Sequence, residues 1–277
     1  DLCDVLAVTV LLPQGGEIPI DRRFDCVVGR LQHASGALGG FSLQFEALQE
    51  VRLGGRGSFE LTESVDGVAS HCDIIIDFRG PPALFPAPEK RDGYLRADAR
   101  HAPSVAKAVL TASKMIGTFE KPLYIRLEES LCAHSRAEKP ACSNCLNVCP
   151  TGAILSAGEH VTIDPMICAG CGSCAAVCPS GAISYDAPSI DILFRRINTL
   201  AETFRKAGGE NPLLLVHDDN SGAEMISLAA RFGRGLPGSV VPLEVDGLAG
   251  FGHAEILAAL ACGFAEVNIL TSPTSEI

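Results

Sequence analysis

CSNCLNVCP at 142–150 and CAGCGSCAAVCP at 168–179 are two cysteine-rich runs that decide how the middle of this 277-residue chain folds. Three cysteines of the first run recur 29 positions later in the second. The tails CPTGAI at 149–154 and CPSGAI at 178–183 correspond as well. The two runs are therefore copies of one unit, and we expect two half-domains related by a pseudo-twofold axis.

The spacing within the second run is typical of a ligand loop for an iron–sulfur cluster. Cys168, Cys171 and Cys174 let one short loop surround one face of a four-iron cluster. The small residues between them allow backbone N–H groups to approach the cluster sulfides. In two-cluster folds the last cysteine of such a run binds the neighbouring cluster, so Cys149 and Cys178 are expected to cross between the halves.

We therefore predict two [4Fe–4S] clusters. The predicted ligands of cluster 1 are Cys132, Cys142, Cys145 and Cys178. The predicted ligands of cluster 2 are Cys149, Cys168, Cys171 and Cys174.

The fourth ligand of cluster 1 departs from the repeat. The repeat places it at position 139, which is Lys139, so we choose the nearest upstream cysteine, Cys132, with an inserted loop at 133–141. Two alternatives remain open. Cluster 1 is a three-iron [3Fe–4S] centre, or its fourth ligand is a different residue such as His134.

Other uses of these cysteines fit the pattern less well. Zinc sites take paired CxxC units, but they rarely use eight thiolates in two CxxCxxxCP units. A disulfide framework is typical of small secreted domains. The spacing accordingly favours iron–sulfur clusters over both.

Residues 132–188 resemble the bacterial two-cluster [4Fe–4S] ferredoxins through these two runs and the proline that follows each. The resemblance covers about a fifth of the chain. It implies a ferredoxin-like module that transfers electrons one at a time. Because such a module is far shorter than 277 residues, it is embedded in a larger protein.

The whole chain is predicted to have a mixed fold, α/β and α+β, in three domains. These are a β-rich α/β scaffold or docking domain at 1–130, the two-cluster domain at 131–188, and a helix plus a parallel βαβαβ unit at 189–277. The chain starts at Asp1 without Met and ends soon after an expected strand, which indicates a piece of a longer protein.

Apolar runs predict the elements of the N-terminal part. Strands are expected at 5–12, 24–31, 41–48, 59–63, 71–78 and 123–127, and a helix at 102–117. The glycine-rich segment at 36–40 is interpreted as a hairpin turn, because it lacks the glycine order of a dinucleotide-binding loop.

The C-terminal part alternates helices with apolar strands, which implies a parallel sheet. Helices are expected at 190–207, 221–232 and 253–262, and strands at 213–217, 240–245 and 267–270. Loops after parallel strands meet at the edge where such sheets bind ligands.

Two of these loops contain candidate site residues. Gly247, Gly250 and Gly252 precede a helix and are a candidate anion or cofactor site, with tight turns as the alternative. His217, beside Asp218 and Asp219, is the best acid–base candidate, and a polar loop explains it equally well.

Residues 240–270 resemble part of the delta subunit of methyl-viologen-reducing hydrogenases, which works with heterodisulfide reductase. The shared features are a strand, a glycine-bearing loop, a helix that ends in ACGFAE at 261–266, and a strand. That family has a cysteine in the loop where this chain has Val245 and Asp246. The overall layout also resembles ferredoxin-containing proteins associated with formate dehydrogenases. It implies a redox partner of the formate dehydrogenase or hydrogenase type.

Composition narrows the function classes. The formal net charge of −11 argues against nucleic acid as a partner. No apolar run approaches the ~18 residues that a membrane span needs. Thiolate clusters need a reducing compartment during assembly, so a cytoplasmic location is expected.

The leading interpretation is an electron-transfer protein or subunit rather than a stand-alone enzyme. One alternative is an oxidoreductase with its own flavin or nicotinamide site in the flanking domains. Another is a scaffold in which the clusters are only structural.

Overall fold

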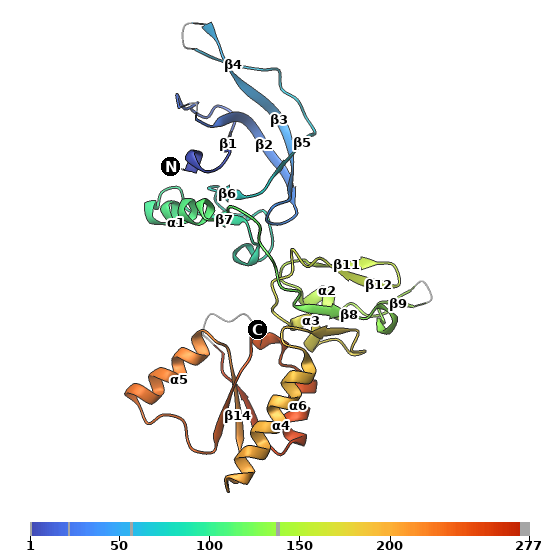
Figure 1. Cartoon of the computed structure of the whole chain (residues 1–277). Helices are drawn as coiled ribbons and strands as arrows, with labels where there is room; N and C mark the ends of the chain where they lie inside the picture. Colours follow the sequence, from blue (N-terminus) through green and yellow to red (C-terminus); the bar gives the residue numbers. More distant parts are fainter. Residues whose placement is uncertain (1, 22, 56–57, 137–138, 272–277) are drawn as a thin grey trace. The chain divides into compact units, whose positions relative to one another are not determined.

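The computed structural model describes residues 2–21, 23–55, 58–136 and 139–271. The chain forms two compact units, Asp1–Glu120 and Lys121–Ile277. Several small sheets alternate with helices, so the fold is mixed α/β as predicted (Figure 1). The division into three domains stays a prediction.

The first unit is built on one long hairpin. Strand β2 (Asp25–Ser35) pairs antiparallel with β3 (Phe41–Leu53). Between them Gly36 and Gly39 have φ angles of 94° and 80°, so the glycine-rich segment is the predicted hairpin turn. The sheet is completed by β1 (Thr9–Leu12), which is parallel to β2, and by β4 (Phe59–Leu61) and β5 (Val68–Cys72), which are antiparallel to β3.

The remaining elements of this unit are η1 (Leu2–Asp4), β6 (Ile75–Asp77), η3 (Pro88–Lys90), β7 (Tyr94–Arg96) and α1 (Ala102–Ser113).

This unit has a small aromatic core. Phe85 packs between Phe41 and Tyr94, with ring centroids 5.6 and 4.9 Å away. The Tyr94 hydroxyl donates a 2.6 Å hydrogen bond to the buried Asp77, which therefore has a partner in the core.

Several predicted elements of this unit are wrong in extent. Strands β2 and β3 continue beyond the predicted runs 24–31 and 41–48, to Ser35 and Leu53, and helix α1 ends at Ser113 instead of 117. The run 5–12 becomes a strand only at Thr9, because the N–H groups of Val5 and Leu6 both donate to the Leu2 carbonyl in a turn. The run 71–78 is split between β5 and β6, which pair with different strands. At the break the Asp73 carbonyl accepts a 2.9 Å hydrogen bond from the N–H of Gly39 instead of a ladder partner.

The cysteine-rich part of the second unit repeats its elements as it repeats its sequence. Helix α2 (Asn144–Val148) and helix α3 (Ser173–Ala176) begin at equivalent positions, as do strands β11 (Ile154–Ala157) and β13 (Ile183–Tyr185). The other elements are β8 (Ile125–Leu127), antiparallel to β13; β12 (His160–Ile163), antiparallel to β11; η4 (Glu129–Leu131); and the pair β9 (Ser135–Arg136) and β10 (Lys139–Pro140).

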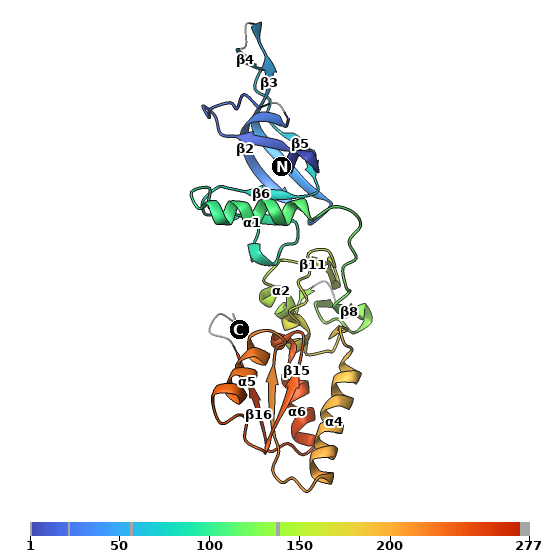
Figure 2. The ribbon, with the colours of Figure 1, turned by 60° about the vertical axis from the view of Figure 1, so that its left-hand side comes forward.

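The C-terminal part of this unit is a three-stranded parallel sheet, as predicted. Its strands are β14 (Leu213–His217) in the centre, flanked by β15 (Val240–Glu244) and β16 (Glu266–Ile269). Its helices are α4 (Ile190–Lys206), α5 (Ser221–Phe232) and α6 (His253–Ala261), with the short η5 (Leu248–Gly250) before α6. Helices α4 and α6 cover one face of the sheet and α5 covers the other (Figure 2).

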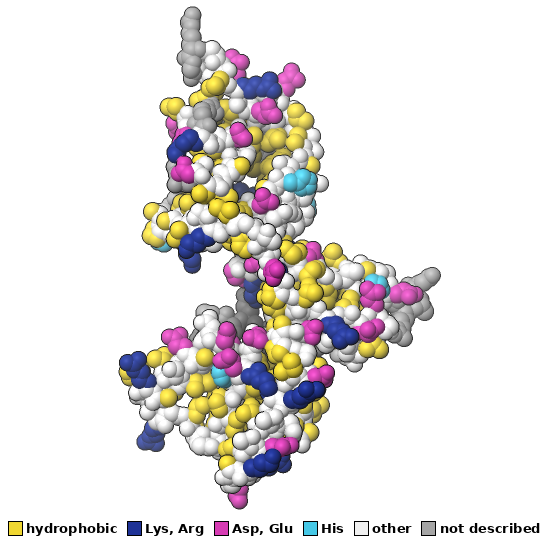
Figure 3. Space-filling model, in the orientation of Figure 1, with side chains coloured by type: hydrophobic (Ala, Val, Ile, Leu, Met, Phe, Trp, Pro, Cys, Tyr) yellow, Lys and Arg dark blue, Asp and Glu magenta, His cyan; other side chains and the backbone are white. Residues whose placement is uncertain are grey.

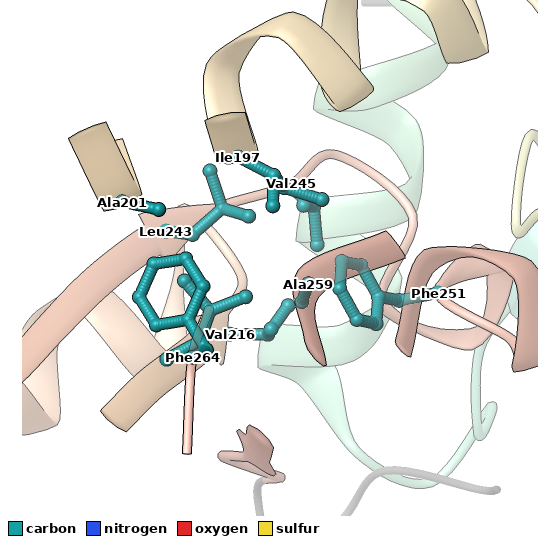
Figure 4. Close-up of a cluster of buried hydrophobic side chains, with 9 residues drawn as sticks. Ile197, Ala201, Val216, Leu243, Val245, Phe251, Ala259 and Phe264 are labelled. Atoms are coloured by element: carbon teal, nitrogen blue, oxygen red, sulfur yellow. The ribbon is translucent and has the colours of Figure 1, made fainter. Parts of the chain in front are cut away.

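Figure 4 shows the core between the sheet and helices α4 and α6. Its fully buried members come from α4, β14 and α6 and are Ile197, Ala201, Leu214, Val216 and Ala259. Val245 and Phe251 belong to the same core, so the loop that joins them is held at both ends. Among the described residues no helix has the length and apolar character of a membrane span.

We expect Leu214→Ala to lower the free energy of unfolding by about 2–5 kcal/mol, because it leaves a cavity in the middle of the C-terminal core. Hydrogen exchange at the β14 amides measures this change. Leu257→Ala is the control: its side chain is 64% exposed, and a change within about 0.5 kcal/mol is expected. Equal losses in the two variants would contradict the core described above.

Candidate metal centre

Two cavities in the second unit are each lined by four cysteines. The first is lined by Cys132, Cys142, Cys145 and Cys178. The second is lined by Cys149, Cys168, Cys171 and Cys174. They hold about 300 and 320 Å³ of space free of protein atoms, open solvent included. The structure thus brings the predicted ligands together in the predicted groups of four.

One cysteine from each half lines the cavity of the other half. Cys149 follows α2 of the first half but lines the second cavity, and Cys178 follows α3 but lines the first. Both side chains pack against one shared core that also contains Ile154, Val161 and Ile183. Each cavity is therefore completed by a cysteine from the other half of the repeat.

Hydroxyl groups lie beside the two crossing sulfurs. The Thr151 Oγ1 lies 3.7 Å from Cys149 Sγ, and the Ser180 Oγ lies 3.7 Å from Cys178 Sγ. The N–H of Ile183 also donates to Cys178 Sγ at 3.4 Å. Sequence reasoning misses Thr151 and Ser180, although a hydroxyl residue at the same place in both CPTGAI and CPSGAI is the signal that identifies them.

The surroundings of the thiols shift their acidity in opposite directions. Burial raises the pKa of Cys174 to about 12. Burial also acts to raise the pKa of Cys178, but hydrogen bonds from Ile183 and Ser180 outweigh it and lower that pKa overall. The thiolate is the form of cysteine that binds metal. The hydrogen bonds around Cys178 stabilise its thiolate and so favour Cys178 as a metal ligand. The buried thiolate of Cys174 would need a bound cation to compensate its charge.

The geometry around the first cavity favours Cys132 over His134 as the fourth ligand of cluster 1. Cys132 is buried and lines the cavity. His134 lies at the same cavity, but both of its ring nitrogens are engaged within the chain. Its Nδ1 donates to the Cys142 carbonyl and its Nε2 then accepts from the Ser156 hydroxyl, both at 2.7 Å. Part of the predicted inserted loop, residues 137–138, lies outside the described residues.

A multi-atom cluster suits these thiols better than a single metal ion does. Among the residues that the structure describes, no three His, Cys, Asp or Glu side chains form a group that could hold one ion. A zinc ion needs four ligands within about 2.0–2.3 Å of one point. The eight thiols instead surround the two cavities in fours, which is the donor set of a [4Fe–4S] cluster.

The candidate glycines of the C-terminal loop contact the cysteine-rich part. A Cβ on Gly250 would lie 3.2 Å from Gly172 Cα, and one on Gly247 would lie 3.1 Å from the Cys171 carbonyl oxygen. The N–H of Gly252, at the start of α6, donates to the Glu255 carboxylate at 2.8 Å. An anion at this helix end would therefore compete with a carboxylate of the chain itself.

The candidate acid–base loop after β14 is engaged in holding the start of α5. Asp218 accepts a 2.6 Å hydrogen bond from the N–H of Gly222 and a 3.3 Å hydrogen bond from the Ser221 hydroxyl. His217 is buried, and its Nδ1 donates to the Asp218 carbonyl at 2.8 Å. These contacts account for His217, Asp218 and Ser221 without a catalytic role, and Asp219 is exposed.

Comparison with known families found a match to the cysteine-rich part of the chain. A family described as a 4Fe-4S dicluster domain matches residues 140–182. This segment contains all of the predicted ligands except Cys132. The match shows a ferredoxin-type module and supports binding of 4Fe–4S clusters and a role in electron transfer. It gives no support to the resemblances to the hydrogenase delta subunit and to the formate dehydrogenase-associated proteins. No curated protein matches the chain.

In the cluster-free chain at pH 8 we expect iodoacetamide to modify Cys178 at least about tenfold faster than Cys174. A thiol with a pKa of about 12 is ionised in only roughly 1 of 10,000 molecules at pH 8, and the thiolate is the nucleophile. Peptide mass spectrometry measures the two rates. In urea the two cysteines should react alike, and equal rates under native conditions would contradict the environments described here.

Proposed function

We propose that this chain is an electron-transfer protein, or a subunit of an oxidoreductase, that holds two [4Fe–4S] clusters. The observation that carries the proposal is the grouping of eight cysteines, four around each of two cavities in one small module. A bound cluster of this type supplies reversible one-electron transfer. The matched dicluster domain supports the same conclusion independently of the geometry.

The proposed ligands divide by cavity. Cluster 1 would be held by Cys132, Cys142, Cys145 and Cys178, and cluster 2 by Cys149, Cys168, Cys171 and Cys174. The place of Cys132 at the first cavity supports a complete four-iron cluster there. A [3Fe–4S] centre, or His134 as a ligand, is the less favoured alternative.

Apolar side chains around the cavities would keep water from the clusters. Ile154, Ala182 and Ile183 line one cavity or the other and are at most 5% exposed. The hydroxyls of Thr151 and Ser180 would donate to the crossing thiolates, which stabilises the negative charge that reduction adds. Burial and hydrogen bonding are the two means by which this chain would set the potentials.

The partner is proposed to be another redox protein, of the formate dehydrogenase or hydrogenase type, in the cytoplasm. The net charge of −11 suits a partner with a basic docking surface. On the face drawn in Figure 3, Lys and Arg side chains are interspersed with Asp and Glu and form no continuous basic area. The predicted domains at 1–130 and 189–277 would flank the electron-carrying module at 131–188.

Anaerobically reconstituted protein should contain about eight iron atoms per chain, from two four-iron clusters. Cys132→Ser should lose about four of them and keep cluster 2, because it removes a ligand of cluster 1 alone. Iron and sulfide analysis with EPR of the reduced protein measures both effects. Cys3→Ser, at a cysteine outside both cavities, is the control and should retain all eight; two intact clusters in Cys132→Ser would disprove the ligand assignment.

His134→Gln should keep about eight iron atoms per chain. The reason is that both ring nitrogens of His134 already have partners in the chain, so no iron ligand is lost. Mössbauer spectroscopy of the variant reports the iron count of each cluster. Loss of one iron, or conversion of cluster 1 to a three-iron centre, would instead identify His134 as the ligand.

A further inference from the structure

The two halves of the cysteine-rich part are alike in sequence but unlike in burial. The repeat pairs Gly170 with Ala141 and Gly172 with Ser143. Both glycines are buried in the loop that borders the second cavity, whereas Ala141 and Ser143 are exposed beside the first. The ligand loop at the second cavity is therefore covered by other parts of the chain, whereas the equivalent loop at the first cavity is exposed.

Two tyrosines cover part of the buried loop. The ring of Tyr124 lies so close to Gly170 that a Cβ there would be 2.7 Å from it. The Tyr185 hydroxyl donates to the Gly170 carbonyl at 2.9 Å. Burial, helped by the nearby charge of Asp246, raises the pKa of Tyr185 to about 12, so this phenol keeps its proton at neutral pH.

The rest of the cover comes from the C-terminal part, as the segment 246–252. A Cβ on Gly172 would lie 2.7 Å from Gly250 Cα, and one on Gly252 would lie 2.8 Å from Ala176 Cβ. Gly247 approaches the carbonyls of the same loop. These contacts join backbone to backbone, and they leave no room for a side chain or for a layer of water.

The covering segment is fixed rather than loosely placed. Val245, which precedes the segment 246–252, and Phe251, which belongs to it, are both buried in the core between the parallel sheet and helices α4 and α6. The N–H of Gly252 is bonded to Glu255, which is itself only 7% exposed. The segment therefore presents a constant surface to the ligand loop.

The residues that line the cavities show the same difference. Asn144, Pro179 and Ser180 line the first cavity and are exposed. Every residue that lines the second cavity is buried or half-buried. Water thus reaches the wall of the first cavity more easily than that of the second.

We infer that the segment 246–252 is a cap on cluster 2, which keeps water away from its ligand loop and holds its midpoint potential below that of cluster 1. The inference rests on the proposed function, since it concerns clusters held in these two cavities. Reduction adds a negative charge to a centre that already carries four thiolates. A buried, water-poor site disfavours that added charge more than a solvated one does.

Gly250→Val and Gly252→Ala test the cap, because each places a side chain where the cap meets the ligand loop. Neither position has a positive φ, so the effect comes from the contact and not from backbone strain. We expect the affinity of cluster 2 for an electron to rise about tenfold, which is ~59 mV for one electron. The potential of cluster 1 should stay unchanged. EPR-monitored titration of the full chain with dithionite measures both potentials, and a Cys132→Ser background identifies the signal of cluster 2.

Gly238→Ala is the matched control, because a Cβ at Gly238 meets no atom within 4 Å in the same part of the chain. Tyr185→Phe is a second test without added volume: it removes the hydrogen bond to Gly170 and should raise the same potential by a smaller amount. It decides the question if the glycine variants lose cluster 2.

An unchanged potential of cluster 2, or equal shifts of both clusters, would overturn the cap. The proposed function would still hold in that case, provided that the unaltered chain contains about eight iron atoms and shows reversible reduction steps. An unaltered chain without iron would instead refute the proposed function itself.

Discussion

The exchange of one cysteine between the two halves is the constraint on which the middle of this protein depends. Cys149 reaches the second cavity and Cys178 the first only because α2 and α3 pack side by side on one core. Each cavity is therefore completed by the half that does not contain its other repeated cysteines. The two halves of the repeat share one core, so the distance between the two sites is set by packing rather than by a linker.

The sequence was sufficient wherever the information is local. Ligand spacing predicts which cysteines share a cavity, because three thiols on one short loop must face the same point. The strand and helix bounds from 190 to 269 are predicted within about two residues, since continuous apolar strands alternate there with amphipathic helices. At the short apolar runs 5–12 and 71–78 the sequence pattern misjudges the ends of the strands. A local turn that closes on the Leu2 carbonyl delays the first strand, and a hydrogen bond from the distant Gly39 to the Asp73 carbonyl interrupts the second.

The contact between the C-terminal loop and the ligand loop could not be predicted in this way. No periodicity connects Gly172 with Gly250, which lie far apart in the chain and meet only in the folded unit. Glycines before a helix suggest an anion site when the sequence is considered alone. Here the same residues allow two backbones to approach closely, and a carboxylate from Glu255 occupies the helix end. The sequence shows that these residues are glycines, but only the folded structure shows that their small size serves a close contact between two loops.

That backbone-to-backbone contact also restricts how the two parts can evolve. A side chain gained at 250 or 252 must be matched by space on the other loop, where Gly172 has a φ of 80° and Ala176 is already small. Neither partner can change alone, so substitutions at these positions should appear as pairs across related sequences. A descendant that lost its C-terminal part would be released from the restriction at 176, yet it would still favour glycine at 172 for the turn of its own backbone.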